Sequence, residues 1–344
     1  MATRIGIVGA GGIGAVVGGM LARAGHDVTL VDQWPEHVEA MKRGGLWITG
    51  VMGEHVVRVK ALHIHELQGV AEPFDVVFVA VKSYDTDWAA LLMLPHLAPD
   101  GVMLSVQNGI NDERIAAVAG RERTAGCVVA IGAAVYEPGV AVCTNVEPVG
   151  FKIGELDGAD TPRIADLARM MGDVGPSEAT THLWVERWSK LAGNCMGNAL
   201  TALAGYTYAE ALRRPETRRI QIQVAAECVR VAGAAGHALG AVWGIPAGPL
   251  LKAAEGRAVE EVETAMLALA DRIGGTARAS FLQDVMKGRR TEIEYLNGYV
   301  AGQGRKLGVP TPFNDAVVEA VRRFPVGRLT PDAKNIEPLI GMLP

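Results

Sequence analysis

The sequence predicts an α/β protein whose first part is a doubly wound, mostly parallel sheet and whose second domain is all-helical. Three observations carry this prediction. The chain opens with a short apolar run, a glycine-rich turn and a helical segment. Apolar runs then alternate with helical segments up to about residue 180, and beyond that point strand signals vanish. The 344 residues are enough for two domains, which we place at 1–180 and 181–344.

The first element is the apolar strand Arg4–Val8, which leads into Gly9-x-Gly11-x-x-Gly14 and then into a helical segment. Strand, glycine turn and helix in this order are typical of a Rossmann-type dinucleotide site. Gly9 allows a tight turn, Gly11 lets a pyrophosphate approach the backbone, and Gly14 allows close packing of helix and strand. The pyrophosphate would meet free N–H groups at the helix start. The expected cofactor-binding residues of this turn are Gly9, Gly11, Gly12, Ile13 and Gly14.

The second strand, His26–Asp32, ends in an acid eighteen residues after Gly14. A carboxylate there accepts hydrogen bonds from the adenosine ribose and repels a 2′-phosphate. Asp32 therefore favours NAD(H), with NADP(H) as the alternative. A flavin nucleotide could use the same glycine fingerprint, so the motif by itself leaves the cofactor open.

The later elements follow from hydrophobic periodicity. Continuous apolar strands indicate a parallel sheet covered on both faces. In the first domain we expect strands over 75–81, 102–106, 126–134, 140–144 and 150–153, and helices over 36–42, 86–94, 111–118 and 161–171. In the second domain we expect helices over 181–204, 216–235, 249–253, 259–270 and 292–307.

Composition excludes several classes of protein. Hydrophobic residues make up 49% and charged residues 21%, with a net charge of −5, so no nucleic-acid partner is expected. The four cysteines lack CxxC spacing and indicate buried, reduced thiols. The histidines form no metal-binding pattern, and we expect no metal. No signal peptide or membrane span is evident, so we expect a cytoplasmic protein.

The segment Trp184–Leu203 carries the most chemistry in the second domain. Lys190, Asn194 and Asn198 are four residues apart and share one helix face among small apolar neighbours. A desolvated lysine has a lowered pKa and can donate a proton. The alternative is that Lys190 extends to the surface while the asparagines bond nearby backbone.

Polar residues also follow two strands of the first domain and a loop of the second. Lys82 and Asn108 lie at strand ends, where a cofactor and a substrate would meet, although they could equally be a solvated charge and a turn residue. Thr291 is expected to begin a helix with Glu292 in its first turn, where the simplest interpretation is a solvated acid near the helix dipole.

Together these residues resemble the ketopantoate reductase (2-dehydropantoate 2-reductase) family over nearly the whole chain. The likeness lies in the early glycine motif, Val81-Lys82-Ser83, Gln107-Asn108-Gly109, the segment from Trp188 to Ala202, and Thr291-Glu292-Ile293 with Asn297-Gly298. The resemblance implies hydride transfer between a nicotinamide and the 2-keto carbon of a small branched keto acid. It implies Lys190 as general acid and Glu292 as a second catalytic residue. It also implies cofactor or substrate contacts for Lys82, Asn108, Asn194, Asn198 and Ser280.

One departure concerns the cofactor. The best-known members use NADPH and carry an arginine after the second strand, whereas this chain has Val31-Asp32-Gln33-Trp34. Two alternatives therefore stand beside pantothenate biosynthesis. One is an NAD-dependent D-2-hydroxyacid or other secondary-alcohol dehydrogenase of the same family. The other is a non-catalytic dinucleotide-binding sensor, against which the complete set of polar residues argues.

The family also implies a homodimer.

Overall fold

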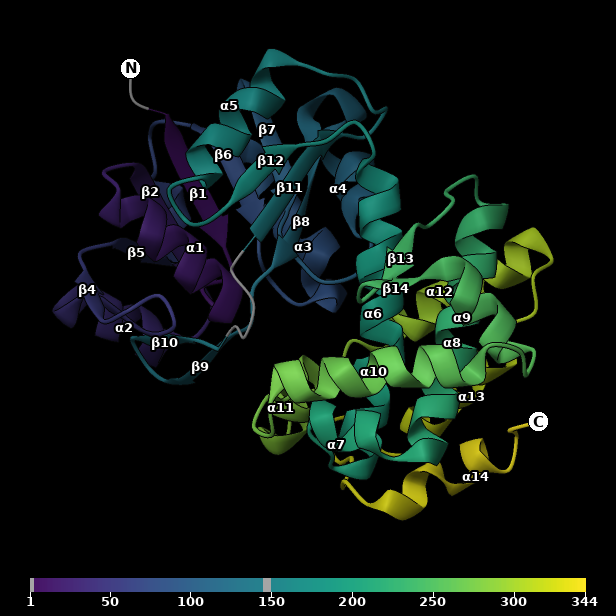
Figure 1. The fold of residues 1–344 in the computed structure, drawn as a ribbon. Coiled ribbons are helices and arrows are strands. Elements are labelled where there is room, and N and C mark those ends of the chain that lie inside the picture. The colour runs from purple at the N-terminus through teal and green to yellow at the C-terminus, as the bar shows by residue number, and fades with distance from the viewer. Residues whose placement is uncertain (1–2, 145–149) are drawn as a thin grey trace. The chain divides into compact units, whose positions relative to one another are not determined.

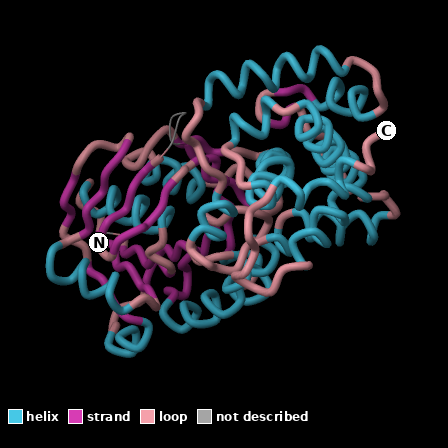
Figure 2. Tube along the Cα trace, turned by 90° about the horizontal axis from the view of Figure 1, so that it is seen from below, coloured by secondary structure: helices cyan, strands magenta, loops and turns pink. Residues whose placement is uncertain are grey.

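The computed structural model describes residues 3–144 and 150–344. The chain forms two compact units, Met1–Leu183 and Trp184–Pro344, called the N-terminal and C-terminal units below (Figure 1). In Figure 2 the strands belong almost entirely to the N-terminal unit, and the part of the chain that leads to the C-terminus is mainly helix. Within the described ranges, no helix has both the length and the apolar character needed to cross a bilayer.

The N-terminal unit is built on an eight-stranded sheet of order β12-β11-β8-β7-β6-β1-β2-β5. Neighbouring strands are parallel except β8 and β11, which are antiparallel. The chain winds outward from β1 in one direction through β2 and β5 and in the other through β6, β7 and β8, which confirms the predicted doubly wound α/β class. The strands are Arg4–Val8 (β1), Asp27–Asp32 (β2), Lys60–His63 (β5), Phe74–Val79 (β6), Leu97–Ser105 (β7), Thr124–Ala130 (β8), Gly150–Glu155 (β11) and Ser177–Ala179 (β12).

Helices cover both faces of this sheet, as continuous apolar strands require. Along β6, Val76 and Phe78 point into one hydrophobic cluster, whereas Val77 and Val79 point into another. The first cluster includes residues of α1, α2 and α5, and the second includes residues of α3 and α4. These helices are Gly12–Arg23 (α1), Pro35–Gly44 (α2), Thr86–Met93 (α3), Asp112–Ala119 (α4) and Pro162–Met171 (α5).

A second, four-stranded sheet of order β4-β3-β10-β9 lies in the same unit. Its strands are Leu46–Gly50 (β3), His55–Val57 (β4), Ala133–Glu137 (β9) and Val140–Cys143 (β10). The prediction of one strand over 126–134 was therefore wrong. After Ala130 the chain leaves the large sheet, and from Ala133 it pairs in the small one. The continuous apolar run gives no sign of this change of partner.

The C-terminal unit is helical apart from a small hairpin, Ala241–Val242 (β13) with Ile245–Pro246 (β14), where no strand was expected. The long helix α6 is buried without interruption from Leu191 to Ala204. The α-helices are Leu183–Ala204 (α6), Tyr208–Arg213 (α7), Pro215–Ala234 (α8), Ala247–Ala254 (α9), Val259–Ile273 (α10), Ser280–Met286 (α11), Asn297–Leu307 (α12), Pro312–Arg322 (α13) and Glu337–Ile340 (α14).

The helix expected over 292–307 begins later than predicted, at Asn297. Glu292 instead precedes a single 3₁₀ turn, Ile293–Tyr295, and Leu296 has φ −111° and ψ −94°, which interrupts the helix. The side chain of Asn297 donates hydrogen bonds to the carbonyl of Cys195 (3.1 Å) and to Oδ1 of Asn314 (3.0 Å). Both contacts are distant in sequence, so local periodicity does not reveal where this helix starts.

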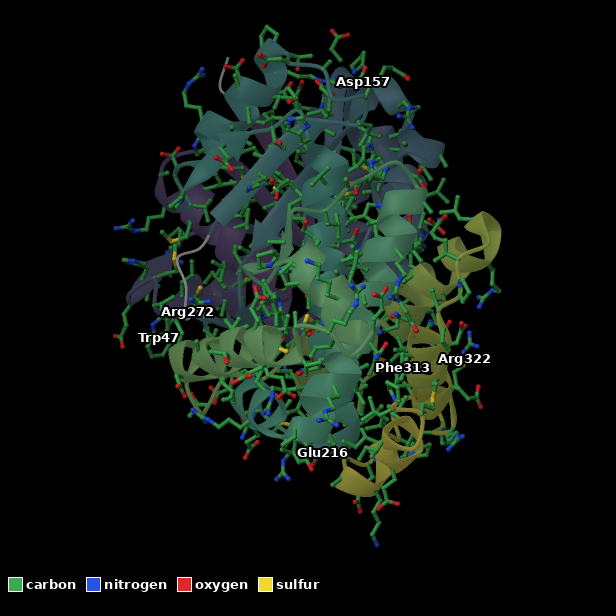
Figure 3. The ribbon with its side chains drawn as sticks, turned by 45° about the vertical axis from the view of Figure 1, so that its right-hand side comes forward. Trp47, Asp157, Glu216, Arg272, Phe313 and Arg322 are labelled. Carbon is green, nitrogen blue, oxygen red and sulfur yellow. The ribbon has the colours of Figure 1, made fainter. Side chains whose placement is uncertain are left out.

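A buried acid organises the start of α13. Glu227, on α8, accepts hydrogen bonds from the backbone N–H groups of Phe313 and Asn314 and from Nδ2 of Asn314, each at 2.8 Å. Phe313 is labelled in Figure 3. The carboxylate therefore satisfies N–H groups at the helix start that have no partner within the helix.

We expect Glu227→Ala to lower the free energy of unfolding by about 3 kcal/mol or more, because each buried donor left unsatisfied costs about 1–3 kcal/mol. Chemical denaturation measures this loss. Glu319→Ala, at an exposed position of the same helix, serves as the control and should change stability by no more than about 0.5 kcal/mol. Equal stability of the two variants would contradict the assigned role of Glu227.

Candidate active site

The glycine turn lies between β1 and α1, beside the end of β6. Gly9 has φ +96°, and a Cβ there would come within 2.7 Å of the backbone nitrogen of Val81. A Cβ on Gly14 would lie 1.9 Å from the carbonyl oxygen of Gly9. A Cβ on Gly11, by contrast, would meet nothing within 4 Å. The turn is thus closed at Gly9 and Gly14 and open at Gly11, as a backbone that receives a pyrophosphate must be.

The start of α1 is suited to an anion. Its N-cap residue, Gly11, offers no side-chain cap, and the first turn contains no acid. The first intrahelical hydrogen bond runs from the N–H of Ala15 to the carbonyl of Gly11, so Gly12, Ile13 and Gly14 have no partner for their N–H groups within the helix. A Cβ on Gly12 would lie 2.4 Å from the carbonyl oxygen of Ala133, which fixes this end of the helix against the second sheet.

Asp32 contacts the glycine turn directly. Its Oδ2 accepts a hydrogen bond from the N–H of Ala10 at 2.6 Å, and its Oδ1 accepts one from the N–H of Trp34 at 2.8 Å. A carboxylate has about four acceptor positions, so lone pairs remain for ribose hydroxyls. Asp32 therefore also holds the turn in shape, a role that its position at a strand end did not indicate.

His37 contacts the same turn at the carbonyl group of Ala10. The N–H of Gly139 donates to Nδ1 of His37 at 2.8 Å, and Nε2 lies 2.9 Å from the carbonyl oxygen of Ala10. Because Nδ1 accepts, the proton is on Nε2, which donates to Ala10. Burial lowers the pKa of His37, although Asp32 and the bond to Ala10 act in the opposite direction. This residue was missed because its partners are far away in sequence.

The neutral state of His37 leads to a pH prediction. A lowered histidine pKa means that its contribution is present above pH 6.5 and is lost as the pH falls through the folded-state value. Protonation would put a hydrogen on Nδ1, opposite the N–H of Gly139. We expect the affinity for NADH, measured by fluorescence titration, to fall severalfold in acid, and His37→Gln to flatten this dependence. The exposed His65→Gln variant is the control, and a wild-type profile without any acid loss would contradict the assignment.

The ends of β6 and β7 are joined by buried polar side chains. Oγ of Ser83 donates to the carbonyl of Asn108 at 3.2 Å, and Nδ2 of Asn111 donates to the same carbonyl at 2.9 Å. Nε2 of Gln107 donates to the carbonyl of Val81 at 2.8 Å. These bonds bring together the segments that contain Lys82 and Asn108, both half-buried. Ser83 and Gln107 belong to the quoted motifs, yet only their tertiary contacts show that they support this edge.

In the C-terminal unit, α6 carries Lys190, Asn194 and Asn198 on one face. Lys190 is half-buried, and burial lowers the pKa of its ammonium group. Asn194 and Asn198 are 8% and 1% exposed. The side chain of Asn198 bonds other side chains rather than backbone, so the alternative in which the asparagines only cap nearby backbone is wrong for this residue.

The carboxamide of Asn198 has a fixed orientation. The hydroxyl of Tyr208 donates to Oδ1 of Asn198 at 2.7 Å, while Nδ2 of Asn198 faces Oγ of Ser280 at 3.4 Å. Burial raises the pKa of Tyr208, so its phenol stays protonated and remains a donor. The structure thus brings the predicted residues Asn198 and Ser280 together. It adds Tyr208, for which the sequence offered no signal beyond its polar character.

Glu292 is only 2% exposed, so the interpretation of a solvated acid in a helix start is wrong. Its backbone carbonyl accepts hydrogen bonds from the N–H groups of Tyr295 and Leu296. A buried carboxyl group in the unit that carries Lys190 is compatible with a catalytic role.

A doubly wound sheet with an open glycine turn, joined to a helical unit with buried polar side chains, is typical of a class of protein, the dinucleotide-dependent oxidoreductases. The family model described as ketopantoate reductase PanE/ApbA matches residues 5–158, and the one for the C-terminal part of the same family matches residues 182–324. The chain belongs to the ketopantoate reductase family, which confirms the resemblance inferred from the motifs.

Curated relatives agree with this assignment. The 2-dehydropantoate 2-reductase of Archaeoglobus fulgidus is 30% identical over 325 residues, covering 93% of this chain and 97% of the relative. The protein of the same name from Mesorhizobium japonicum is 30% identical over 348 residues, covering 94% and 98%. The similarity thus extends through both units.

Solved structures show the same fold. A PanE/ApbA family ketopantoate reductase from Ralstonia eutropha has a TM-score of 0.78 at 30% identity, covering 93% of this chain and 98% of that one. The 2-dehydropantoate 2-reductase of Geobacter metallireducens has a TM-score of 0.80 at 27% identity, covering 93% and 99%. A D-mandelate dehydrogenase solved with NADH and anilino(oxo)acetate shares the fold with a TM-score of 0.80 at 23% identity, covering 93% and 97%.

Proposed function

We propose that this chain catalyses reversible hydride transfer between NAD(H) and the 2-keto carbon of a small branched 2-keto acid, with reduction of 2-dehydropantoate to pantoate as the leading candidate. The observation that carries the proposal is the full-length similarity to 2-dehydropantoate 2-reductases, together with the polar set on α6 and α11. A dinucleotide-binding sensor without catalysis would have no need for that set.

The cofactor assignment rests on the N-terminal unit. The open space at Gly11 and the N–H groups at the start of α1 fit a pyrophosphate. Asp32 favours a ribose with a free 2′-hydroxyl, and Gln33-Trp34 supplies no cation for a 2′-phosphate. Lys82 and Asn108 are proposed to contact the nicotinamide end, because Lys82 follows β6, the neighbour of β1, and Asn108 follows β7, the next strand along.

When bound, the nicotinamide supplies the hydride for the 2-keto carbon. Lys190 donates a proton from Nζ to the carbonyl oxygen as negative charge develops there. Asn194, Asn198 and Ser280 donate hydrogen bonds to the substrate oxygens, and Glu292 organises the lysine and the substrate. In the reverse direction Lys190 accepts the hydroxyl proton, so oxidation of the alcohol requires the neutral amine.

The test is a steady-state comparison of NADH and NADPH with 2-dehydropantoate and bulkier 2-keto acids. It also compares NAD⁺ and NADP⁺ with 2-hydroxy acids and with a secondary alcohol that has no carboxylate. We expect kcat/KM to be at least tenfold higher with NADH and highest for a branched 2-keto acid. Highest turnover of a secondary alcohol without a carboxylate would favour the second candidate, a general alcohol dehydrogenase. Binding of NADH without turnover of any of these compounds would contradict the proposal.

Two further predictions concern context. The Staphylococcus aureus ketopantoate reductase, which shares the fold at 19% identity, is described as dimeric. A homodimer of this chain stays a prediction, which sedimentation analysis can test, and so does a cytoplasmic location.

A further inference from the structure

The turn between β13 and β14 contains a tryptophan in an unusual backbone conformation. Trp243 has φ +52° and is followed by Gly244 at φ +78°. Left-handed backbone suits glycine, whereas a bulky residue adopts it only where the surrounding structure holds it in place. Such positions cluster at functional sites, which makes the surroundings of Trp243 informative.

The indole of Trp243 lies against α6 where that helix has no side chains. A Cβ on Gly193 would come within 2.4 Å of Nε1 of the indole, and a Cβ on Gly197 would come within 2.6 Å of Cη2. The ring therefore runs along the helix, with its five-membered part at Gly193 and its six-membered part at Gly197. The glycine pair thus fixes the place of the indole.

This position is next to the polar face of the same helix. Gly193 and Gly197 immediately precede Asn194 and Asn198, and adjacent residues on a helix lie about 100° apart around its axis. The ring of Tyr208 packs edge-to-face on Trp243, with centroids 5.6 Å apart and an interplanar angle of 83°. The hydroxyl of Tyr208 in turn bonds Asn198. Trp243 as a residue is half-buried, so it is not enclosed by the helices around it.

We propose that Trp243 is the apolar wall that sets how large a substituent on the 2-keto carbon the site accepts. This inference rests on the proposed function. A branched 2-keto acid has a polar keto-acid group, which suits Lys190 and the asparagines, and an apolar branch, for which those residues offer nothing. The rigid indole beside them supplies an apolar surface whose position leaves little freedom to adapt to bulkier groups.

The test measures kcat/KM for 2-dehydropantoate and for the bulkier 2-oxo-2-phenylacetate. Trp243→Gly removes the ring and suits the left-handed backbone, and Trp243→Phe reduces the ring. We expect Trp243→Gly to raise the ratio of bulky to small substrate at least tenfold, with an intermediate value for Trp243→Phe. A purely structural role would lower both values together and leave the ratio unchanged, which would overturn the proposal. If Trp243→Gly does not fold, the ratio for Trp243→Phe decides.

The glycines provide a matched pair of variants. A Cβ at Gly197 would meet the indole at 2.6 Å and also the ring of Tyr208, which holds Asn198, at 2.7 Å. We therefore expect Gly197→Ala to lower kcat/KM for both substrates at least tenfold and to change the ratio between them. Gly302→Ala, on α12, adds a Cβ that meets nothing within 4 Å and should leave both values within twofold. If Gly197→Ala leaves both kcat/KM values unchanged, the proposed role of Trp243 is wrong. If the wild type turns over 2-keto acids but the Trp243 variants leave the ratio of the two kcat/KM values unchanged, only the proposed role of Trp243 is rejected. If the wild type turns over no 2-keto acid, the proposed function is rejected as well.

Discussion

Replacing Lys190 by alanine is expected to lower kcat for keto acid reduction by a factor of about 10² to 10⁴, the usual contribution of a positioned general acid. The loss should appear in kcat and kcat/KM alike, because the proton is transferred in the transition state. Affinity for NADH, measured by fluorescence, should stay unchanged, since the residues proposed to bind the cofactor lie in the N-terminal unit. Added small primary amines should restore part of the activity.

The control for this variant is Lys252→Ala, at an exposed position on α9, which should retain full activity. Full turnover by Lys190→Ala would show that another group donates the proton, and the catalytic assignment would fall.

Lys190 also determines a pH dependence. Burial lowers its pKa from the ordinary value of 10.5, and reduction needs the protonated amine. The rate of reduction should therefore decline on the alkaline side at a pH below 10.5, while the rate of alcohol oxidation should rise over the same range. Lys190→Arg, whose guanidinium stays protonated, should lose this alkaline decline along with most of its activity.

The second large effect is expected at Asp32. Its carboxylate holds Ala10 and Trp34 and is proposed to bind the ribose, and hydrogen bonds to a charged group contribute about 1.5–3 kcal/mol each. We expect Asp32→Ala to lower kcat/KM with NADH by a factor of about 10 to 100. Asp32→Arg should shift the preference toward NADPH. Alanine also removes the hydrogen bonds that hold the glycine turn. With either cofactor, kcat/KM of Asp32→Ala should therefore stay below the value of the wild type with NADH.

Asp27→Asn is the matched control, since Asp27 lies at the opposite end of β2 and pairs with Arg4 at the exposed edge. It should leave the ratio of NADH to NADPH efficiency within twofold. A wild-type preference for NADPH, or an unchanged ratio in Asp32→Arg, would contradict the role assigned to this acid.

Local signals were sufficient for the first part of the fold. The strand at Arg4–Val8, the glycine turn and the helix after it combine apolar periodicity with glycines that steric contact requires. The small second sheet was not predicted as such, because β3 and β4 are short and place Trp47 and Val56 at the surface. An alternating, partly exposed pattern over three to five residues is a weak signal.

The residues of the candidate site also differ in how far local sequence signals could reveal them. Lys190, Asn194 and Asn198 could be grouped from their spacing, since one helix places them together. His37, Tyr208 and Trp243 could not, because each acts through a contact with a residue far away along the chain. Glu292 was predicted to lie in the first turn of a helix, but that helix begins at Asn297. The side chain of Asn297 bonds Cys195 and Asn314, and contacts with such distant residues leave no local signal of where the helix starts.

Transfer of a hydride from NADH to the 2-keto carbon of a keto acid can be followed with an isotope. The most direct measurement supplies NADH carrying deuterium at C4 of the nicotinamide, together with 2-dehydropantoate, and follows the product by nuclear magnetic resonance and mass spectrometry. We expect pantoate with a single deuterium at C2 when one face of the nicotinamide is labelled, and pantoate without deuterium when the other face is labelled. Pantoate without deuterium from either label, or no pantoate at all, would contradict it.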